Sequence, residues 1–422
     1  MPNLPPGSDP SISVLLNCLH REPHRFPTKQ LTEMNRKQWK RLGDCATEHR
    51  VVPLLYQRLM AAGDGIQTEA SRSSLEYMSA YSRQVSKNNL LFYGELRKLL
   101  SALDEKNIPV ILLKGIYLAE HVYENRGLRE MNDMDLLFKK EHLEIVYQLL
   151  TEMGYQPISH VYMNDINQII QINKHLPRLI KKDVAGIEIH WNITKPGRSY
   201  HIEPDGIIQR ASPINKAGVN ALSLTAEDLL LHLCLHTSYQ HNFAFGLRPF
   251  CDLKTVIDRF DKLDWDEVCS RSAEYGWRRG VLLSLVIAKD FLGADVPEDI
   301  IKRLHADDSI PALVETARRQ ILTKKEDSKA AGNAVITFAS AEGLTGKTSA
   351  VIKRLFISKD QMIAKYPIRP GSPMIYLWYL VRFGQMIWFH TSKILRVSRG
   401  DPEYTGIIER KEELHSWLNK EN

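Results

Sequence analysis

Cysteine is scarce in this chain, whose 422 residues contain only Cys18, Cys45, Cys234, Cys251 and Cys269. No two of them form a Cys-x-x-Cys pair. An odd, scattered set in a large chain is not a disulfide framework, and it indicates reduced thiols and a cytoplasmic location. The amino terminus also lacks the basic and apolar segments of a signal peptide, so we expect no secretory leader.

Long apolar runs are missing as well. The longest one, Met374 to Phe389, is interrupted by Arg382 and Gln385. It is too short and too polar for a membrane span, so we expect none. A buried or partner-facing aromatic helix is the favoured interpretation, and a helix lying in a membrane interface is the alternative.

Dense runs of Lys and Arg do not occur, although the net charge is +6. A mildly basic balance suits an anionic substrate such as a nucleotide, and it does not require nucleic acid as a partner. With 43% hydrophobic and 25% charged residues, the composition is that of a globular protein. The length suggests two or three domains.

Helix and strand signals alternate only in the middle of the chain. The predicted elements are a helix at 92–103, a buried strand at 110–113, a short helix at 116–123, a strand at 134–138, a helix at 143–153, and a hairpin of 176–181 and 187–191. Beyond about residue 200 the strand signals mostly vanish. A capping box at Thr225–Asp228 and a helical run at 277–292 then predict helices. We therefore expect an α+β fold.

Acidic residues adjoin two of the predicted strands. Asp133 and Asp135 precede the apolar run Leu136–Phe138, and side chains two apart in a strand share a face. Like charges so close are costly without a cation. Glu188 and His190 share a face of the second strand. Three carboxylates on neighbouring strands predict a Mg²⁺ site, in which Glu188 is either a ligand or the group that activates an attacking hydroxyl.

Basic residues precede the acids. Lys114 and Gly115 stand at a strand-to-helix turn, where a flexible backbone, helix amides and an ammonium suit phosphate oxygens. Arg126 and Arg129 lie in the loop before Asp133, and Arg129 is placed to clamp a triphosphate. Ordinary turn and surface roles are the alternative for all four, and His190 is a further candidate for the nucleotide site.

Two other motifs carry weaker signals. His232 and His236 share a helix face, but Cys234 points away and no Glu follows His232, so core or pocket-lining histidines are favoured over a zinc site. The segment Glu342–Thr348 is similar to the end of a P-loop, but Ala341 stands where that motif needs glycine. We expect neither motif to carry the function.

The order of the central motifs resembles the bacterial uncharacterised nucleotidyltransferase family, which belongs to the DNA polymerase beta-like superfamily. The resemblance covers roughly residues 86–260. The residues that carry it are Leu113–Gly115, Arg129, Asp133–Leu137, Ile187–Trp191, Leu230–His236 and Arg248–Leu253.

The resemblance implies a small mixed β-sheet flanked by helices, and a helical domain that closes over the nucleotide. It implies two Mg²⁺ ions, with Asp133 and Asp135 matching the metal-binding acids and Glu188 the third acid. Gly115 stands where the superfamily usually has a Gly-Ser turn, and Ile116 replaces the serine. The expected regions are an N-terminal helical region at 1–85, the catalytic core at 86–200, the closing helical domain at 201–320 and a C-terminal helical region at 321–422.

The expected function is Mg²⁺-dependent transfer of a nucleoside monophosphate from an NTP. The acceptor would be a hydroxyl or phosphate of a small molecule, sugar or peptide, in biosynthesis. Alternatives are transfer of a phosphoryl or glycosyl group on the same scaffold, or nucleotide binding without catalysis. Nucleic acid is a weaker option as partner. The sequence leaves the acceptor, the base and the oligomeric state open.

Overall fold

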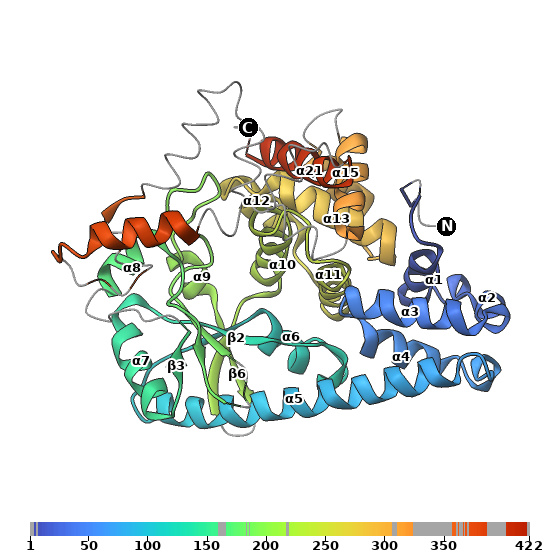
Figure 1. Cartoon of the computed structure of the whole chain (residues 1–422), viewed down its shortest axis with the longest axis horizontal. Coiled ribbons are helices and arrows are strands. Elements are labelled where there is room, and N and C mark those ends of the chain that lie inside the picture. Colours follow the sequence, from blue (N-terminus) through green and yellow to red (C-terminus); the bar gives the residue numbers. More distant parts are fainter. Residues whose placement is uncertain are drawn as a thin grey trace.

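A seven-stranded mixed sheet lies between one very long helix and the helices of the later half of the chain (Figure 1). The computed structural model describes residues 4–5, 7–158, 166–182, 184, 186–216, 219–305, 310–323, 357–359, 362, 366, 368, 371–385 and 402–419. The expected α+β architecture, with helical regions at both ends of the chain, is confirmed.

The strand order of the sheet is β3-β4-β5-β2-β1-β7-β6. The strands are β1 (Ile111–Leu113), β2 (Asp133–Leu137), β3 (Gln156–Pro157), β4 (Leu179–Ile180), β5 (Gly186–His190), β6 (Ser212–Lys216) and β7 (Val219–Ser223). β2 runs antiparallel to β1 and parallel to β5, so it is a central strand with partners on both sides. The predicted hairpin is confirmed as the antiparallel pair of β4 and β5.

Helices account for most of the remaining described chain. They are α1 (Pro10–Leu19), α2 (Thr28–Glu33), α3 (Arg36–Glu48), α4 (Val52–Ala61), α5 (Arg72–Asp104), α6 (Lys114–His121), α7 (Leu143–Glu152), α8 (Ile166–Ile172), α9 (Asp205–Arg210), α10 (Ala226–Leu235), α11 (Arg248–Arg259), α12 (Trp265–Glu274), α13 (Arg278–Leu292), α14 (Glu298–Leu304), α15 (Ile310–Leu322) and α21 (Pro402–Leu418). Short helical turns are η1 (Pro23–Arg25), η2 (Asp64–Ile66), η3 (Arg126–Leu128), η4 (Lys140–His142) and the π-helical η6 (His236–Gln240).

The long helix α5 runs beneath the sheet and extends to the N-terminal helices (Figure 1). The predicted helix at 92–103 is its C-terminal third, where an apolar stripe is buried. The buried Asn89 amide donates to the carbonyl oxygens of Arg126 (2.5 Å) and Arg129 (2.9 Å). α5 thereby fixes the loop that leads into β2.

Strand formation after residue 200 corrects the sequence-based expectation. β6 and β7 form a hairpin, and β7 pairs in parallel with β1, so the sheet extends to Ser223. β6 contains Pro213, Asn215 and Lys216, which have low strand propensity, so its sequence gave little signal. Pairing with an existing sheet edge outweighs that propensity. The division into domains at residue 200 stays a prediction.

The later helices pack on one another above the sheet (Figure 1). The Thr225 side chain accepts a hydrogen bond from the Asp228 amide and begins α10, as the capping motif predicts. α21 packs on α15, and the Asn242 amide donates to the Lys411 carbonyl oxygen at 2.7 Å. This bond joins the C-terminal helix to the turn that follows α10.

Within the described residues, no helix is both long and apolar enough to cross a membrane. The aromatic segment predicted as a helix is helical over 375–385, and its residues 386–389 lie outside the described residues. The motif at Glu342–Thr348 also lies outside them.

Candidate active site on strands β2 and β5

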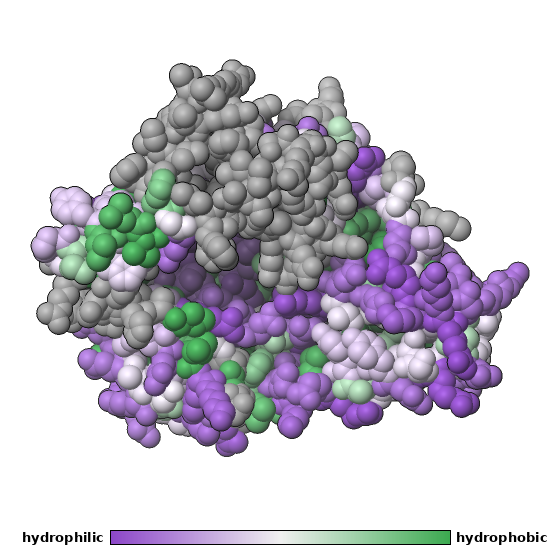
Figure 2. Space-filling view, in the orientation of Figure 1, coloured by the Kyte–Doolittle hydropathy of each residue, from purple (hydrophilic) through white to green (hydrophobic). Residues whose placement is uncertain are grey.

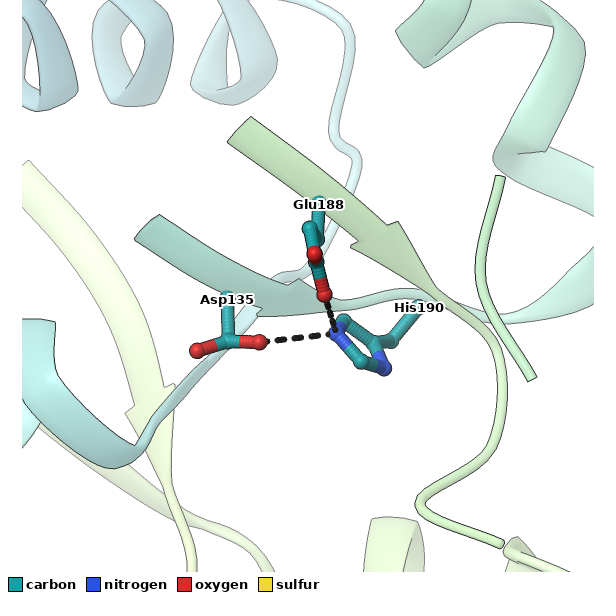
Figure 3. Close-up of side chains that lie close together, drawn as sticks. All are labelled: Asp135, Glu188 and His190. Atoms are coloured by element: carbon teal, nitrogen blue, oxygen red, sulfur yellow. Dashed lines mark hydrogen bonds and ion pairs between the residues drawn. The ribbon is translucent and has the colours of Figure 1, made fainter. Parts of the chain in front are cut away.

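The candidate site lies on one face of two central strands. Asp135 of β2 is paired in register with Glu188 of β5, and Leu137 with His190. The intervening residues Met134, Leu136, Ile187 and Ile189 are buried in the hydrophobic core. Alternation along each strand therefore turns the polar side chains to the opposite face, where Asp135, Glu188 and His190 point toward one another (Figure 3).

His190 holds the two carboxylates together. Its Nε2 lies 2.9 Å from Asp135 Oδ1 and 3.3 Å from Glu188 Oε2. One ligand atom from each of the three residues falls within 4.8 Å of the others. Asp133 is outside this group, although it shares the strand face and is paired with Gly186. The tight cluster thus contains His190 where the sequence predicted Asp133.

Lys114 contributes an ammonium to the same cluster. Its Nζ lies 2.8 Å from Asp135 Oδ1, and both side chains are largely buried. The residue has a φ of +45°, in the left-handed region, at the junction of β1 and α6. Such a backbone costs a non-glycine residue on the order of 1 kcal/mol or more. Strain of this kind is typical of functional turns.

Burial and mutual repulsion divide the three carboxylates. Burial opposes ionisation of Asp135, but the charge of Lys114 and the His190 hydrogen bond bring its pKa well below the ordinary value. Burial, followed by repulsion from Asp135, raises the pKa of Asp133. Burial also works against Glu188, yet its hydrogen bond with His190 lowers the net pKa to about 2. Asp135 and Glu188 are therefore ionised at neutral pH.

The donor atoms fit a divalent cation. Carboxylate oxygens are the ligands that Mg²⁺ prefers, and the imidazole nitrogen widens the choice to transition metals. Asp135, Glu188 and His190 would hold the ion, and Asp133 lies on the same strand face for a second one.

Arg129 lies in a buried ion pair. Its Nε and Nη2 each donate to Asp252 of α11 at 2.9 Å, and the Tyr123 hydroxyl donates to the same carboxylate at 2.8 Å. Any side chain at Gly115 would overlap with Arg129 Nη1, so the glycine has a packing reason. These contacts favour a structural role for Arg129, and the triphosphate clamp and the Gly115 phosphate contact stay predictions.

Arg126 lies at the surface. Its Nη2 donates to Glu120 at 2.6 Å, and its guanidinium lies 5.0 Å from the centre of the Tyr93 ring. The nucleotide contact predicted for it also stays a prediction.

A basic segment beside β5 was not among the site residues predicted from the sequence. Lys174, His175 and Arg178 precede β4, and His175 forms a bridge with His190. Arg178 crosses Gly186, where any side chain would overlap with its guanidinium, and its Nη1 lies 3.9 Å from Asp133. These three residues stand directly before β4, which pairs with β5, the strand of Glu188. The sequence therefore contained a signal of charge complementarity between the two segments.

The histidines of α10 and η6, His232 and His236, do not belong to the acidic cluster. His232 is buried, and within the part of the chain that the structure describes neither of its ring nitrogens has a hydrogen-bond partner. Burial, followed by the charges of Lys114 and Lys174, keeps its pKa well below the ordinary value. Among the described residues, the group of potential metal ligands contains neither His232 nor His236. The expectation that they are core or pocket-lining histidines and not a zinc site stays a prediction.

Comparison with known proteins gives one family. A model described as "Uncharacterised nucleotidyltransferase" matches residues 35–293, which include both strands of the site and the helices α10 and α11. None of the curated proteins compared with the chain matches it.

Proposed function

The chain belongs to this uncharacterised nucleotidyltransferase family, and from that premise we propose that it transfers a nucleoside monophosphate from an NTP with the help of Mg²⁺. The acceptor is a hydroxyl or phosphate of a small molecule, sugar or peptide, in a cytoplasmic biosynthetic reaction. The observation that carries the proposal is the convergence of Asp135, Glu188 and His190 on one face of paired strands.

The acidic face supplies the negative charge that such chemistry needs. Asp133, Asp135 and Glu188 would hold two Mg²⁺ ions, which when bound neutralise charge on the phosphates. Because the pKa of Glu188 is about 2, this carboxylate is ionised and weakly basic at neutral pH. That property favours a ligand role for Glu188 over the role of general base.

The group transfer itself balances simply. An acceptor oxygen forms a bond to the α-phosphorus, the bond between that phosphorus and the bridging oxygen breaks, and pyrophosphate leaves. A hydroxyl acceptor releases its proton to water. Lys114 and the Gly115 amide are the groups proposed to contact the leaving phosphates. The reason is their place beside the acids, since Lys114 Nζ lies 2.8 Å from Asp135 Oδ1.

Calorimetry with each of the four NTPs, with and without Mg²⁺, tests the donor site. Asp135→Asn should abolish Mg²⁺-dependent NTP binding while the protein stays folded, and we expect turnover to fall by about 10³-fold. The matched control is Asp205→Asn, because Asp205 is an exposed aspartate at the start of α9.

The product mass then identifies the group transferred. An acceptor that gains a nucleoside monophosphate supports the proposal, whereas a gain of phosphoryl or sugar points to the alternative transferases. Binding of an NTP that is never consumed would indicate a non-catalytic protein. Full activity of Asp135→Asn would contradict the site assignment.

A further inference from the structure

Lys174 is a buried lysine without an anionic partner among the residues that the structure describes. Its side chain is only 8% exposed, and its Nζ donates to Gln240 Oε1 at 2.7 Å and to the Ile193 carbonyl oxygen at 3.3 Å. Both acceptors are neutral, and no carboxylate of the described residues pairs with this ammonium. An ammonium has three hydrogens, so one donor is left for a ligand.

Burying an unpaired charge is unfavourable, and the pKa of Lys174 reflects this. Burial, followed by the charge of Lys114, lowers the pKa of Lys174 to about 7. Asp135 and Glu188 oppose this shift from across the site. An anion placed on the free donor of Lys174 would relieve the unfavourable desolvation, as a carboxylate does in an ordinary ion pair.

Gln240 keeps the lysine in this position. Its Nε2 donates to the Ile193 carbonyl oxygen at 2.7 Å while its Oε1 accepts from Lys174. Gln240 ends the π-helical turn η6 and is therefore held by the backbone of the helical domain. The lysine thus links the sheet to that domain through neutral groups alone.

A buried imidazole, His232 of α10, experiences the charge of the same lysine. His232 is 1% exposed, and neither ring nitrogen has a partner among the described residues. Burial lowers its pKa most, followed by the charge of Lys114 and then by that of Lys174. A neutral imidazole always carries one N–H, so His232 has a donor without an acceptor among the described residues.

Figure 2 shows a hollow in the molecular surface whose visible floor is hydrophilic, on the face where the sheet meets the helical domain.

Lys114 and Lys174 lie next to different neighbours of strand β2, one on each side of it within the sheet. Lys114 follows β1, whereas the Lys174 carbonyl oxygen accepts from the amides of Trp191 and Asn192, directly after β5. β5 and β1 are the two neighbours of β2. A substrate group on Lys174 would therefore lie on the Glu188 side of the acids, away from the turn proposed for the triphosphate.

We propose that Lys174 and His232 form a subsite for a phosphate group, with Gln240 as the positioning residue for the lysine. This inference rests on the proposed function, since it assigns the phosphate to the acceptor and so names a phosphorylated acceptor class. The donor's own phosphates carry the same chemistry, and the placement beside Glu188 favours the acceptor.

Calorimetric titration with inorganic phosphate tests the subsite directly, because it needs neither turnover nor an identified acceptor. We expect the wild-type protein to bind phosphate and Lys174→Met to bind it about 10- to 100-fold more weakly, the loss of one charge-assisted hydrogen bond. The matched control is Lys182→Met, which removes an exposed lysine between β4 and β5. An equal loss in both variants would overturn the proposal, as would wild-type protein that binds no phosphate.

A second titration, with Mg²⁺ and a non-hydrolysable ATP analogue present, separates the two sources of phosphate. Binding that persists beside the analogue assigns the subsite to the acceptor. Binding that is competed away overturns that assignment and gives the subsite to the donor. If the analogue does not bind at all while phosphate still does, the proposed function fails and the subsite stands.

A second variant, together with thermal melting of each protein, tests whether weaker binding results from loss of folding. Gln240→Glu leaves Lys174 in place and gives it a carboxylate partner, so we expect weaker phosphate binding without loss of the ammonium. Unchanged phosphate affinity in folded Gln240→Glu and folded Lys174→Met would contradict the subsite.

Discussion

Two buried groups of charged side chains lie near the loop that leads into β2, and they are balanced differently. In one, Asp252 accepts two hydrogen bonds from Arg129 and one from Tyr123, so both carboxylate oxygens are paired within the chain. In the other, the acids of β2 and β5 lie in close contact with Lys114 and His190, while Arg178 and His175 approach them only to 3.9 Å. A complete ion pair is typical of structure, whereas an excess of one charge is typical of a binding site.

This difference explains why the type and the spacing of charged residues in the sequence did not suffice to assign their roles. Arg129 and Lys114 both precede acidic residues in the sequence and both suit a phosphate. In the fold, Arg129 is committed to α11, while Lys114 lies among the acids of the site. The following changes test that contrast, beginning with the largest expected effect.

Arg129→Met should destabilise the protein by about 3–5 kcal/mol, because it leaves the Asp252 carboxylate buried without its guanidinium. Urea denaturation measures this change in the free energy of unfolding. Arg50→Met serves as the control, since Arg50 is partly exposed and lies 3.8 Å from Glu130 in a long ion pair. Unchanged stability combined with lost NTP binding would show that Arg129 contacts the triphosphate, as the sequence predicted.

Glu188→Gln should reduce stability at neutral pH by on the order of 1 kcal/mol, because the folded state holds the pKa of Glu188 at about 2, below the ordinary 4.5. A lowered carboxyl pKa stabilises the fold above the unfolded value, and this stabilisation is lost as the pH falls through the folded value. The difference between wild type and variant should thus shrink between pH 4.5 and about 2. Urea titrations at several pH values measure it, and a constant difference would contradict the assignment.

Arg126→Ala should cost only about 0.2–1 kcal/mol, since its ion pair with Glu120 is at the surface. Thermal melting measures the stability, and calorimetry with the bound NTP measures the affinity. Weaker NTP binding at nearly unchanged stability would confirm the nucleotide contact predicted from the sequence. Unchanged affinity would make Arg126 a surface residue.

Asp133→Asn should leave stability within about 0.5 kcal/mol of the wild type or increase it. Burial and the charge of Asp135 raise the pKa of Asp133, so the folded state disfavours its ionised form at neutral pH. The amide removes that repulsion, and thermal melting without metal measures the result. Marked destabilisation would show that Asp133 is part of a complete ion pair, like Asp252, and would erase the contrast between the two groups.

Much of the sheet could be predicted because its strands carry their own signal. The apolar runs at β1, β2 and β5 match a buried sheet, and the alternation around Glu188 gave the face of the acids correctly. The β6–β7 hairpin could not be predicted, because its residues have weak strand propensity and pairing with β1 stabilises it. Local propensity fails where a distant partner decides.

The candidate site was predictable in its acids and less so in its cations. Asp135, Glu188, His190 and Lys114, all singled out in the sequence, lie together. Lys174 was missed although it stands in a basic segment with His175 and Arg178, because such a segment is usually a solvated surface. Its burial and its neutral partners become visible only when η6 is brought against the end of β5.

By itself the sequence determined which side chains share a strand face, since the two-residue repeat of a β-strand is a local property of the backbone. It also determined the family through the order of its motifs. The tertiary structure alone decided which charges are paired. Arg129 and Asp252 are 123 residues apart, and Lys174 and Gln240 are 66 apart. Whether a charge is compensated depends on contacts between distant parts of the chain, which no local pattern records.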